Sequence, residues 1–105
     1  MSKYRWTQED DYVCCKEYLE FVFIEKIESN ANTLIDRICK KLPHISRGSI
    51  RMKVQNIKQV ALEGGLEDVI DITPLLNYSE QCKKAFDKAF WDLEYIINDS
   101  DNMSE

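Results

Sequence analysis

The stretch TLIDRICKKLPHISRGSIRMKVQNIKQVAL, residues 33–62, decides the fold. Its first part carries apolar residues at the spacing of one helical face, and Pro43 ends that helix because proline has no backbone N–H to donate. After a short turn, a second helix runs from about Ser49 to the end of the stretch, where two glycines follow. Two helices joined by a short turn, the second of them basic, predict a helix-turn-helix.

Helical patterns flank this stretch on both sides. Upstream, Thr7 begins a helix with Asp10 as its capping-box partner, and apolar residues then recur at intervals of three and four. Downstream, the segment around Ser79 opens a last helix whose broad apolar face runs to residue 97. Between the helices, residues 69–72 are rich in Val and Ile and predict a short extended segment.

These elements predict a mainly α protein, with a tri-helical helix-turn-helix-like core closed by a long C-terminal helix. We expect one helical domain over residues 5–97, with the helix-turn-helix at 33–62 and the C-terminal helix at 79–97. Residues 98–105 are polar and acidic, which predicts a flexible tail. The apolar face over 86–97 is wide enough to serve either the core or a homodimer interface.

The length and composition restrict the class of protein. A chain of 105 residues forms one small domain, and it buries roughly 60–65% of its unfolded surface. Apolar residues make up 44% and charged residues 31%, which excludes collagen-like, low-complexity and wholly disordered chains. The sequence contains neither an apolar run long enough for a membrane span nor a signal-peptide core, so we expect a cytoplasmic protein with no membrane partner.

The formal net charge of −5 conceals an uneven distribution. Residues 1–36 hold four basic and eight acidic groups, and residues 63–105 hold three basic and eleven acidic groups. Residues 37–62 between them hold seven basic groups and no acidic group. This acid-free stretch favours a nucleic-acid partner, and the alternatives are an ordinary solvated face or a protein-binding surface.

Placing the basic helix at 100° per residue separates a core stripe from a polar face. Ile50, Val54, Ile57 and Ala61 fall together and predict the buried side. On the other faces, Arg and Gln suit bidentate contacts to guanine and adenine edges, Lys suits phosphates, and a serine at the helix start adds a backbone N–H. The candidate binding residues are Lys40, Lys41, Arg47, Ser49, Arg51, Lys53, Gln55 and Lys58.

The sequence carries little that supports catalysis. It has no phosphate-binding loop, dinucleotide-binding glycine pattern or nucleophile-elbow motif, and its one histidine, His44, leaves no nucleophile–base pair. The four cysteines form no C-x-x-C pair, so they predict buried or half-buried thiols in a reducing compartment. The aromatic residues, Trp91 among them, lie mostly at helical spacing and predict core positions. We therefore expect a non-enzymatic protein without metal or cofactor.

The stretch GSIRMKVQNI, residues 48–57, is similar to a helix of the small domain that precedes the HNH nuclease domain in many bacterial and phage restriction-type endonucleases. Gly65-Leu66 and the segment 74–78 match later features of that domain, and the opening Trp6-Thr7-x-Glu9 also resembles Myb-like modules. The resemblance implies a helical module that helps to engage DNA. The positions that match are Arg47, Ser49, Lys53, Gln55 and Asn56. No His-Asn-His pattern is present, so nuclease activity is not implied.

Together these patterns predict a small non-enzymatic DNA-binding accessory protein, of the kind that phages and mobile elements carry, which contacts DNA through its basic third helix. The alternative is an anti-defence, anti-CRISPR-type inhibitor that binds a host nuclease complex. Such an inhibitor would act by protein–protein contact, or by DNA mimicry through the acidic residues 63–105.

Overall fold

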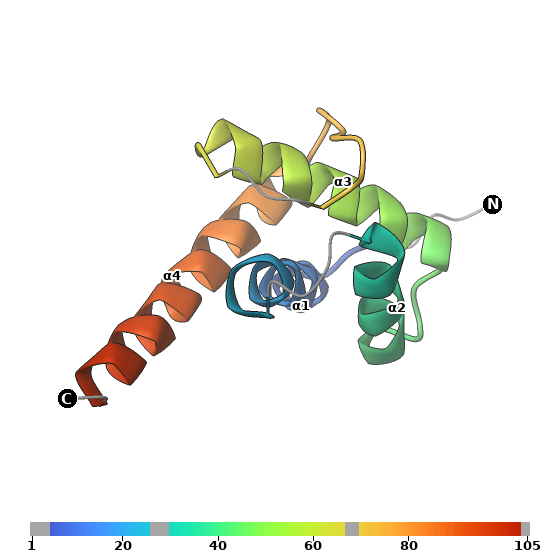
Figure 1. Ribbon diagram of the computed structural model, residues 1–105. Helices are drawn as coiled ribbons and strands as arrows, with labels where there is room; N and C mark the ends of the chain where they lie inside the picture. The colour runs from blue at the N-terminus through green and yellow to red at the C-terminus, as the bar shows by residue number, and fades with distance from the viewer. Residues whose placement is uncertain (1–4, 26–29, 67–69, 104–105) are drawn as a thin grey trace.

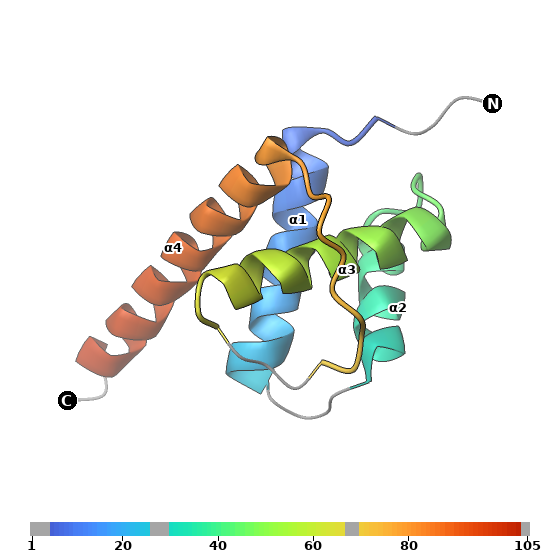
Figure 2. The ribbon, with the colours of Figure 1, turned by 90° about the horizontal axis from the view of Figure 1, so that it is seen from above.

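A computed structural model describes residues 5–25, 30–66 and 70–103, with side chains over 5–23, 30–66 and 70–94. The described chain forms α1 (Gln8–Leu19), the π-helical segment η1 (Glu20–Glu25), α2 (Ala31–Lys41), α3 (Arg47–Glu63) and α4 (Glu80–Met103). This confirms a mainly α protein. Figures 1 and 2 show α3 lying across α1, with α2 and α4 on opposite sides of α1.

The first helix begins as predicted, and it continues into the π-helical segment η1. The Thr7 hydroxyl accepts a hydrogen bond from the Asp10 backbone N–H, and the Asp10 carboxylate accepts one from the Thr7 N–H, both at 3.1 Å. At its other end, Glu20 keeps right-handed helical angles of φ −61° and ψ −43°. The chain therefore passes from α1 into η1 without a break. The aromatic and β-branched residues of η1 continue the helix with wider, π-helical turns.

Helix α3 is longer than predicted at its start, because Ser46 caps it. The Ser46 hydroxyl accepts from the backbone N–H of Ser49 at 3.2 Å, which places Arg47 inside the first turn of the helix. At the other end, Gly65 adopts φ +83° and the Leu66 N–H donates to the Ala61 carbonyl at 2.9 Å. This Schellman motif ends α3 at the predicted pair of glycines.

The extended segment expected near residues 69–72 is not a strand in the described residues 70–72. Residue 69 itself lies outside the described residues. Ile70 and Ile72 are buried, and the Ile72 N–H donates to the Ile70 carbonyl, so the chain turns locally. No strand is present among the described residues to pair with this segment, and its two isoleucines are instead buried in the hydrophobic core.

Helix α4 extends past the predicted boundary at residue 97. The Ser79 hydroxyl accepts from the Cys82 N–H at 3.0 Å and begins the helix, which then runs to Met103. The expected flexible tail over 98–105 is thus helical as far as residue 103, and residues 104–105 lie outside the described chain.

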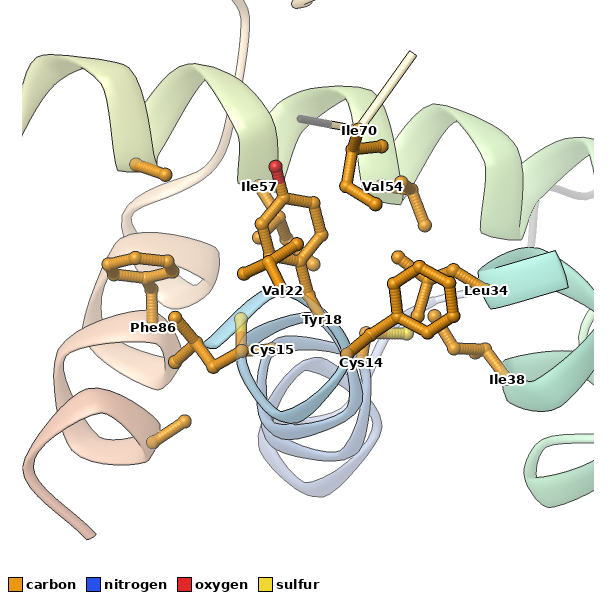
Figure 3. Packing of buried hydrophobic residues seen from close by; sticks show 14 of the residues in the cluster. Cys14, Cys15, Tyr18, Val22, Leu34, Ile38, Val54, Ile57, Ile70 and Phe86 are labelled. Carbon is orange, nitrogen blue, oxygen red and sulfur yellow. The ribbon is translucent and has the colours of Figure 1, made fainter. Parts of the chain in front are cut away.

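The hydrophobic core surrounds α1. Figure 3 shows Leu34 and Ile38 of α2, Val54 and Ile57 of α3 and Phe86 of α4 directed toward this central helix, and all five are buried. The predicted stripe of α3 is confirmed, since each of its four apolar residues is fully buried. The expectation for Trp91 is wrong: this residue lies on α4 and is 69% exposed.

The cysteines are free thiols, as predicted. Cys14, Cys15 and Cys82 are buried, and Cys39 is half-buried. Burial is the main cause that raises the pKa of the Cys14 and Cys15 thiols above the ordinary value. These thiols therefore stay protonated at neutral pH and act as small apolar side chains between the helices.

A tyrosine–carboxylate hydrogen bond links α1 to α4. The Tyr12 hydroxyl donates to the Asp92 carboxylate at 2.6 Å, and the Lys88 ammonium lies 4.7 Å from the Tyr12 ring centroid. The hydrogen bond is the main cause that raises the pKa of Tyr12 to about 12, and it also lowers the pKa of Asp92. The bond therefore stabilises the fold only while Tyr12 is protonated and Asp92 is ionised.

This pair predicts a two-sided pH dependence that the Tyr12→Phe variant lacks. Its contribution is complete below the ordinary tyrosine pKa of 10.0 and is lost as the pH rises through about 12. On the acid side, it is present above the ordinary aspartate pKa of 3.8 and is lost as the pH falls through the lowered value. Thermal unfolding followed by circular dichroism should show the Tm difference between wild type and variant shrinking at both extremes. A difference that is constant across the pH range would contradict this assignment.

Candidate nucleic-acid interface

The turn between α2 and α3 is anchored to the core by one apolar side chain. Pro43 follows the last residues of α2, and Ile45 is buried, with its N–H donating to the Leu42 carbonyl at 3.1 Å. This anchor brings the end of α2 beside the start of α3. Four of the predicted site residues surround the turn on the exposed surface, and we call them the basic corner: Lys40, Lys41, Arg47 and Arg51.

Two members of the basic corner are available to a ligand. Lys40, at the end of α2, and Arg51, in the second turn of α3, are exposed. Neither forms an ion pair with any residue in the described part of the chain. No described residue therefore neutralises their charges, and uncompensated charges of this kind suit strong contacts to phosphate or to guanine.

The other two members are oriented by acidic residues. The Lys41 ammonium lies 3.4 Å from the carboxylate of Glu17, which is almost completely buried in α1, yet the lysine side chain stays 58% exposed. Arg47 pairs with the exposed Asp36 of α2, and this contact raises the pKa of the arginine further above its ordinary value. Arg47 is thus held against α2 in the free protein, and a ligand must compete with Asp36 for it.

Lys53 and Lys58 do not belong to this surface, although the helical spacing suggested them. The Lys53 ammonium is buried 2.8 Å from the Asp11 carboxylate and 4.6 Å from the centroid of the Trp6 ring. The buried Lys58 ammonium donates to the Ile70 carbonyl at 2.7 Å. Asp11 and Ile70 both lie on other segments of the chain. The spacing along α3 therefore predicted exposed lysines at two positions where the structure has buried ones.

Gln55 and Ser49 also form hydrogen bonds within the protein. The Gln55 amide donates to the Thr73 carbonyl at 3.1 Å, and its backbone carbonyl accepts from the Leu75 N–H at 3.1 Å. Ser49 belongs to the cap, since its hydroxyl accepts from the Ser46 hydroxyl at 2.9 Å. The segment 70–78 therefore packs against α3, and Figure 2 shows it crossing over the middle of this helix. It covers one side of the helix from Gln55 onward and leaves the first two turns open.

The open part of α3 includes two features that no sequence pattern singles out. Met52 is 56% exposed beside Arg51, and Gly48 has no atom within 4 Å of the position where a Cβ would lie. A side chain in place of Gly48 would therefore meet open space. His44, in the preceding turn, lies with its Nε2 3.1 Å from the Asp10 carboxylate.

In comparisons with known proteins, no family model, no curated protein and no solved structure matches this chain significantly. The resemblance to the HNH-associated domain accordingly stays a prediction that rests on the sequence. Over the described residues, no group of three or more His, Cys, Asp or Glu side chains is arranged to hold a metal ion. No helix in the same part of the chain is both long and apolar enough to cross a membrane.

The different environments of Lys53 and Arg51 predict different effects on stability. Lys53→Ala leaves the fully buried Asp11 carboxylate without its cation and should lower the free energy of unfolding by about 3–5 kcal/mol. Arg51→Ala, two residues away on the exposed surface, should change it by less than about 0.5 kcal/mol. Urea unfolding of the two variants measures both values. Equal and small effects would show that the Lys53 ammonium is not buried beside Asp11.

Proposed function

We propose that this protein is a non-enzymatic DNA-binding protein that contacts DNA through the basic corner and the first two turns of α3. One observation carries the proposal: four of the seven basic residues in the acid-free stretch 37–62 are exposed around a single turn. Two of them, Lys40 and Arg51, keep charges that no described residue pairs. The order of α2, a short turn and α3 supports a helix-turn-helix reading of this part of the chain.

The open surface supports entry of the start of α3, rather than its whole length, into the major groove. Arg47 and Arg51 are one helical turn apart and extend toward the same end of α3, where arginine can make bidentate contacts to guanine. Lys40 and Lys41 flank them at the end of α2 and suit phosphates. Segment 70–78 prevents a deeper approach along α3, because it is hydrogen-bonded to Gln55.

The net negative charge of the protein does not oppose this mode of binding. In Figures 1 and 2, the C-terminal end of α4, where the sequence is acidic, lies on the opposite side of the molecule from the start of α3. The 17 residues of α3 alone span about 25 Å at a rise of about 1.5 Å per residue. This exceeds the Debye length of about 8 Å at physiological ionic strength. Salt therefore screens most of the repulsion between the acidic end of α4 and DNA bound at the basic corner.

The alternative function is an inhibitor of a host nuclease complex, and the exposure of Trp91 favours its protein–protein form over DNA mimicry. A DNA mimic needs unpaired carboxylates. On the described part of α4, Glu80, Asp87 and Asp92 each pair with a lysine one turn away, at 3.6, 2.8 and 3.1 Å. Pull-down from a lysate before and after nuclease treatment distinguishes a partner recruited through DNA from one that the protein contacts directly.

The DNA proposal predicts a salt-dependent affinity that depends on the basic corner. The double variant Lys40→Ala/Arg51→Ala should bind a short random-sequence duplex at least about tenfold more weakly at low salt. It should also reduce the slope of log affinity against log salt by about two, because two phosphate or base contacts are removed. Fluorescence anisotropy across a salt series measures both quantities.

A matched control removes the same charge elsewhere. Lys83→Ala/Lys84→Ala deletes two cations from α4, where both pair with acids of the same helix. This variant should keep the wild-type slope and nearly the wild-type affinity. The proposal is overturned if the wild type shows no binding at low salt, or if both double variants lose affinity equally.

A further inference from the structure

Two buried thiols meet where α1 packs against the start of α4. Cys15 of α1 and Cys82 of α4 are both fully buried. The Cys15 sulfur lies 3.9 Å from the Cys82 carbonyl oxygen, and the two thiols also hydrogen-bond to each other, with Cys15 as the donor. The fold therefore makes neighbours of two sulfur atoms whose residues are 67 positions apart in the sequence.

The adjacent Cys14 lies on a different side of α1. Successive residues on an α-helix project about 100° apart. In Figure 3, Cys15 lies on the side of α1 toward Phe86 of α4, whereas Cys14 lies on the side toward Leu34 of α2. The pair that joins α1 to α4 is therefore Cys15 with Cys82.

The surroundings of Cys82 favour its thiolate. The hydrogen bond from Cys15 is the main cause that lowers the pKa of the Cys82 thiol, and the Lys53 ammonium lowers it further, while burial and the Asp11 carboxylate oppose this shift. Cys82 also lies in the first turn of α4, where the helix dipole favours negative charge. Cys15 keeps its proton, because burial raises its pKa. One sulfur is thus suited to act as a nucleophile, and the other to react with it in a second step.

We propose that Cys15 and Cys82 form a reversible disulfide between α1 and α4 when the protein meets a hydroperoxide. The Cys82 thiolate attacks one oxygen of hydrogen peroxide and breaks the O–O bond, which gives a sulfenic acid, and the departing hydroxide takes up the thiol proton as water. The Cys15 sulfur then attacks the sulfenic sulfur, and its proton leaves with the hydroxyl group as a second water. Two thiols and one peroxide thus become one disulfide and two water molecules.

The oxidant approaches along the line where α1 and α4 meet. An open groove of about 300 Å³ lies there, and its border includes Tyr12 of α1 and both Gln81 and Ala85 of α4. Gln81 directly precedes Cys82 in the chain, so the groove reaches the turn that carries this thiol. Because both sulfur atoms are buried, contact requires the first turn of α4 to open locally, which costs less than global unfolding.

This inference does not depend on the proposed DNA contact. The basic corner lies where α2 meets α3, and the two thiols belong to α1 and α4. Oxidation should therefore leave the DNA affinity of the basic corner unchanged. A protein that forms the disulfide without binding DNA, or binds DNA without forming the disulfide, separates the two proposals.

The test oxidises the full chain in a Cys39→Ala background, which removes the half-buried thiol. After incubation with hydrogen peroxide, the protein is unfolded and its free thiols are alkylated. Two of the three remaining cysteines should be protected, and mass spectrometry should find residue 15 linked to residue 82. Dithiothreitol should restore alkylation of both.

The disulfide should also raise the Tm of the protein by at least about 5 °C, because it restricts the unfolded chain between residues 15 and 82. Circular dichroism of the oxidised and reduced forms measures this difference. The gain should disappear when dithiothreitol is added.

Three variants in the same background locate the bond. Cys15→Ala and Cys82→Ala should each prevent both the disulfide and the rise in Tm. Cys14→Ala removes an equally buried thiol beside Cys15 and should keep both effects. If a variant does not fold, the linkage found in the Cys39→Ala protein decides the outcome by itself. The proposal is overturned if no intramolecular disulfide forms, if the linkage joins residue 14 in place of residue 15, or if oxidation leaves the Tm unchanged or lowers it.

Discussion

The buried ion pair between Asp11 and Lys53 sets the arrangement on which the exposed surfaces depend. The two groups lie 2.8 Å apart, with Asp11 completely buried. The amide of Gln81, from α4, donates to the same carboxylate at 2.8 Å and to the Trp6 carbonyl at 2.9 Å. One carboxylate of α1 therefore connects α3 and α4. Because a buried charge without its partner is costly, the three helices are held in one mutual orientation.

This pair also determines which side of α3 faces solvent. Residues two apart on an α-helix project about 200° from each other, so an inward Lys53 turns Arg51 outward. The same rotation places the Lys58 ammonium against the Ile70 carbonyl and Gln55 against Thr73. The seven basic residues of 37–62 are thus divided by the fold. Lys53 and Lys58 are buried against interior groups, whereas Lys40, Lys41, Arg47 and Arg51 form the exposed basic corner.

The surfaces at the two ends of α3 therefore differ in charge and polarity. Positive charge is exposed where α2 meets α3, while Leu66, just after the other end of α3, borders a largely apolar groove with Phe23, Phe90, Leu93 and Glu94. The proposed DNA-binding function uses the first of these surfaces, and the length of α3 separates it from the second.

Local patterns in the sequence determined most of the helices. The Thr7–Asp10 capping box, the stop at Pro43, the end of α3 at its glycines and the apolar stripe from Ile50 to Ala61 are all short-range features, and the structure confirms each. The tertiary structure alone decided which charged residues are available. The partners of Lys53, Lys58 and Gln55 are on other segments of the chain, and so is the segment that covers α3. Helical periodicity assigns a residue to a face, but only packing against distant segments determines whether that face meets water.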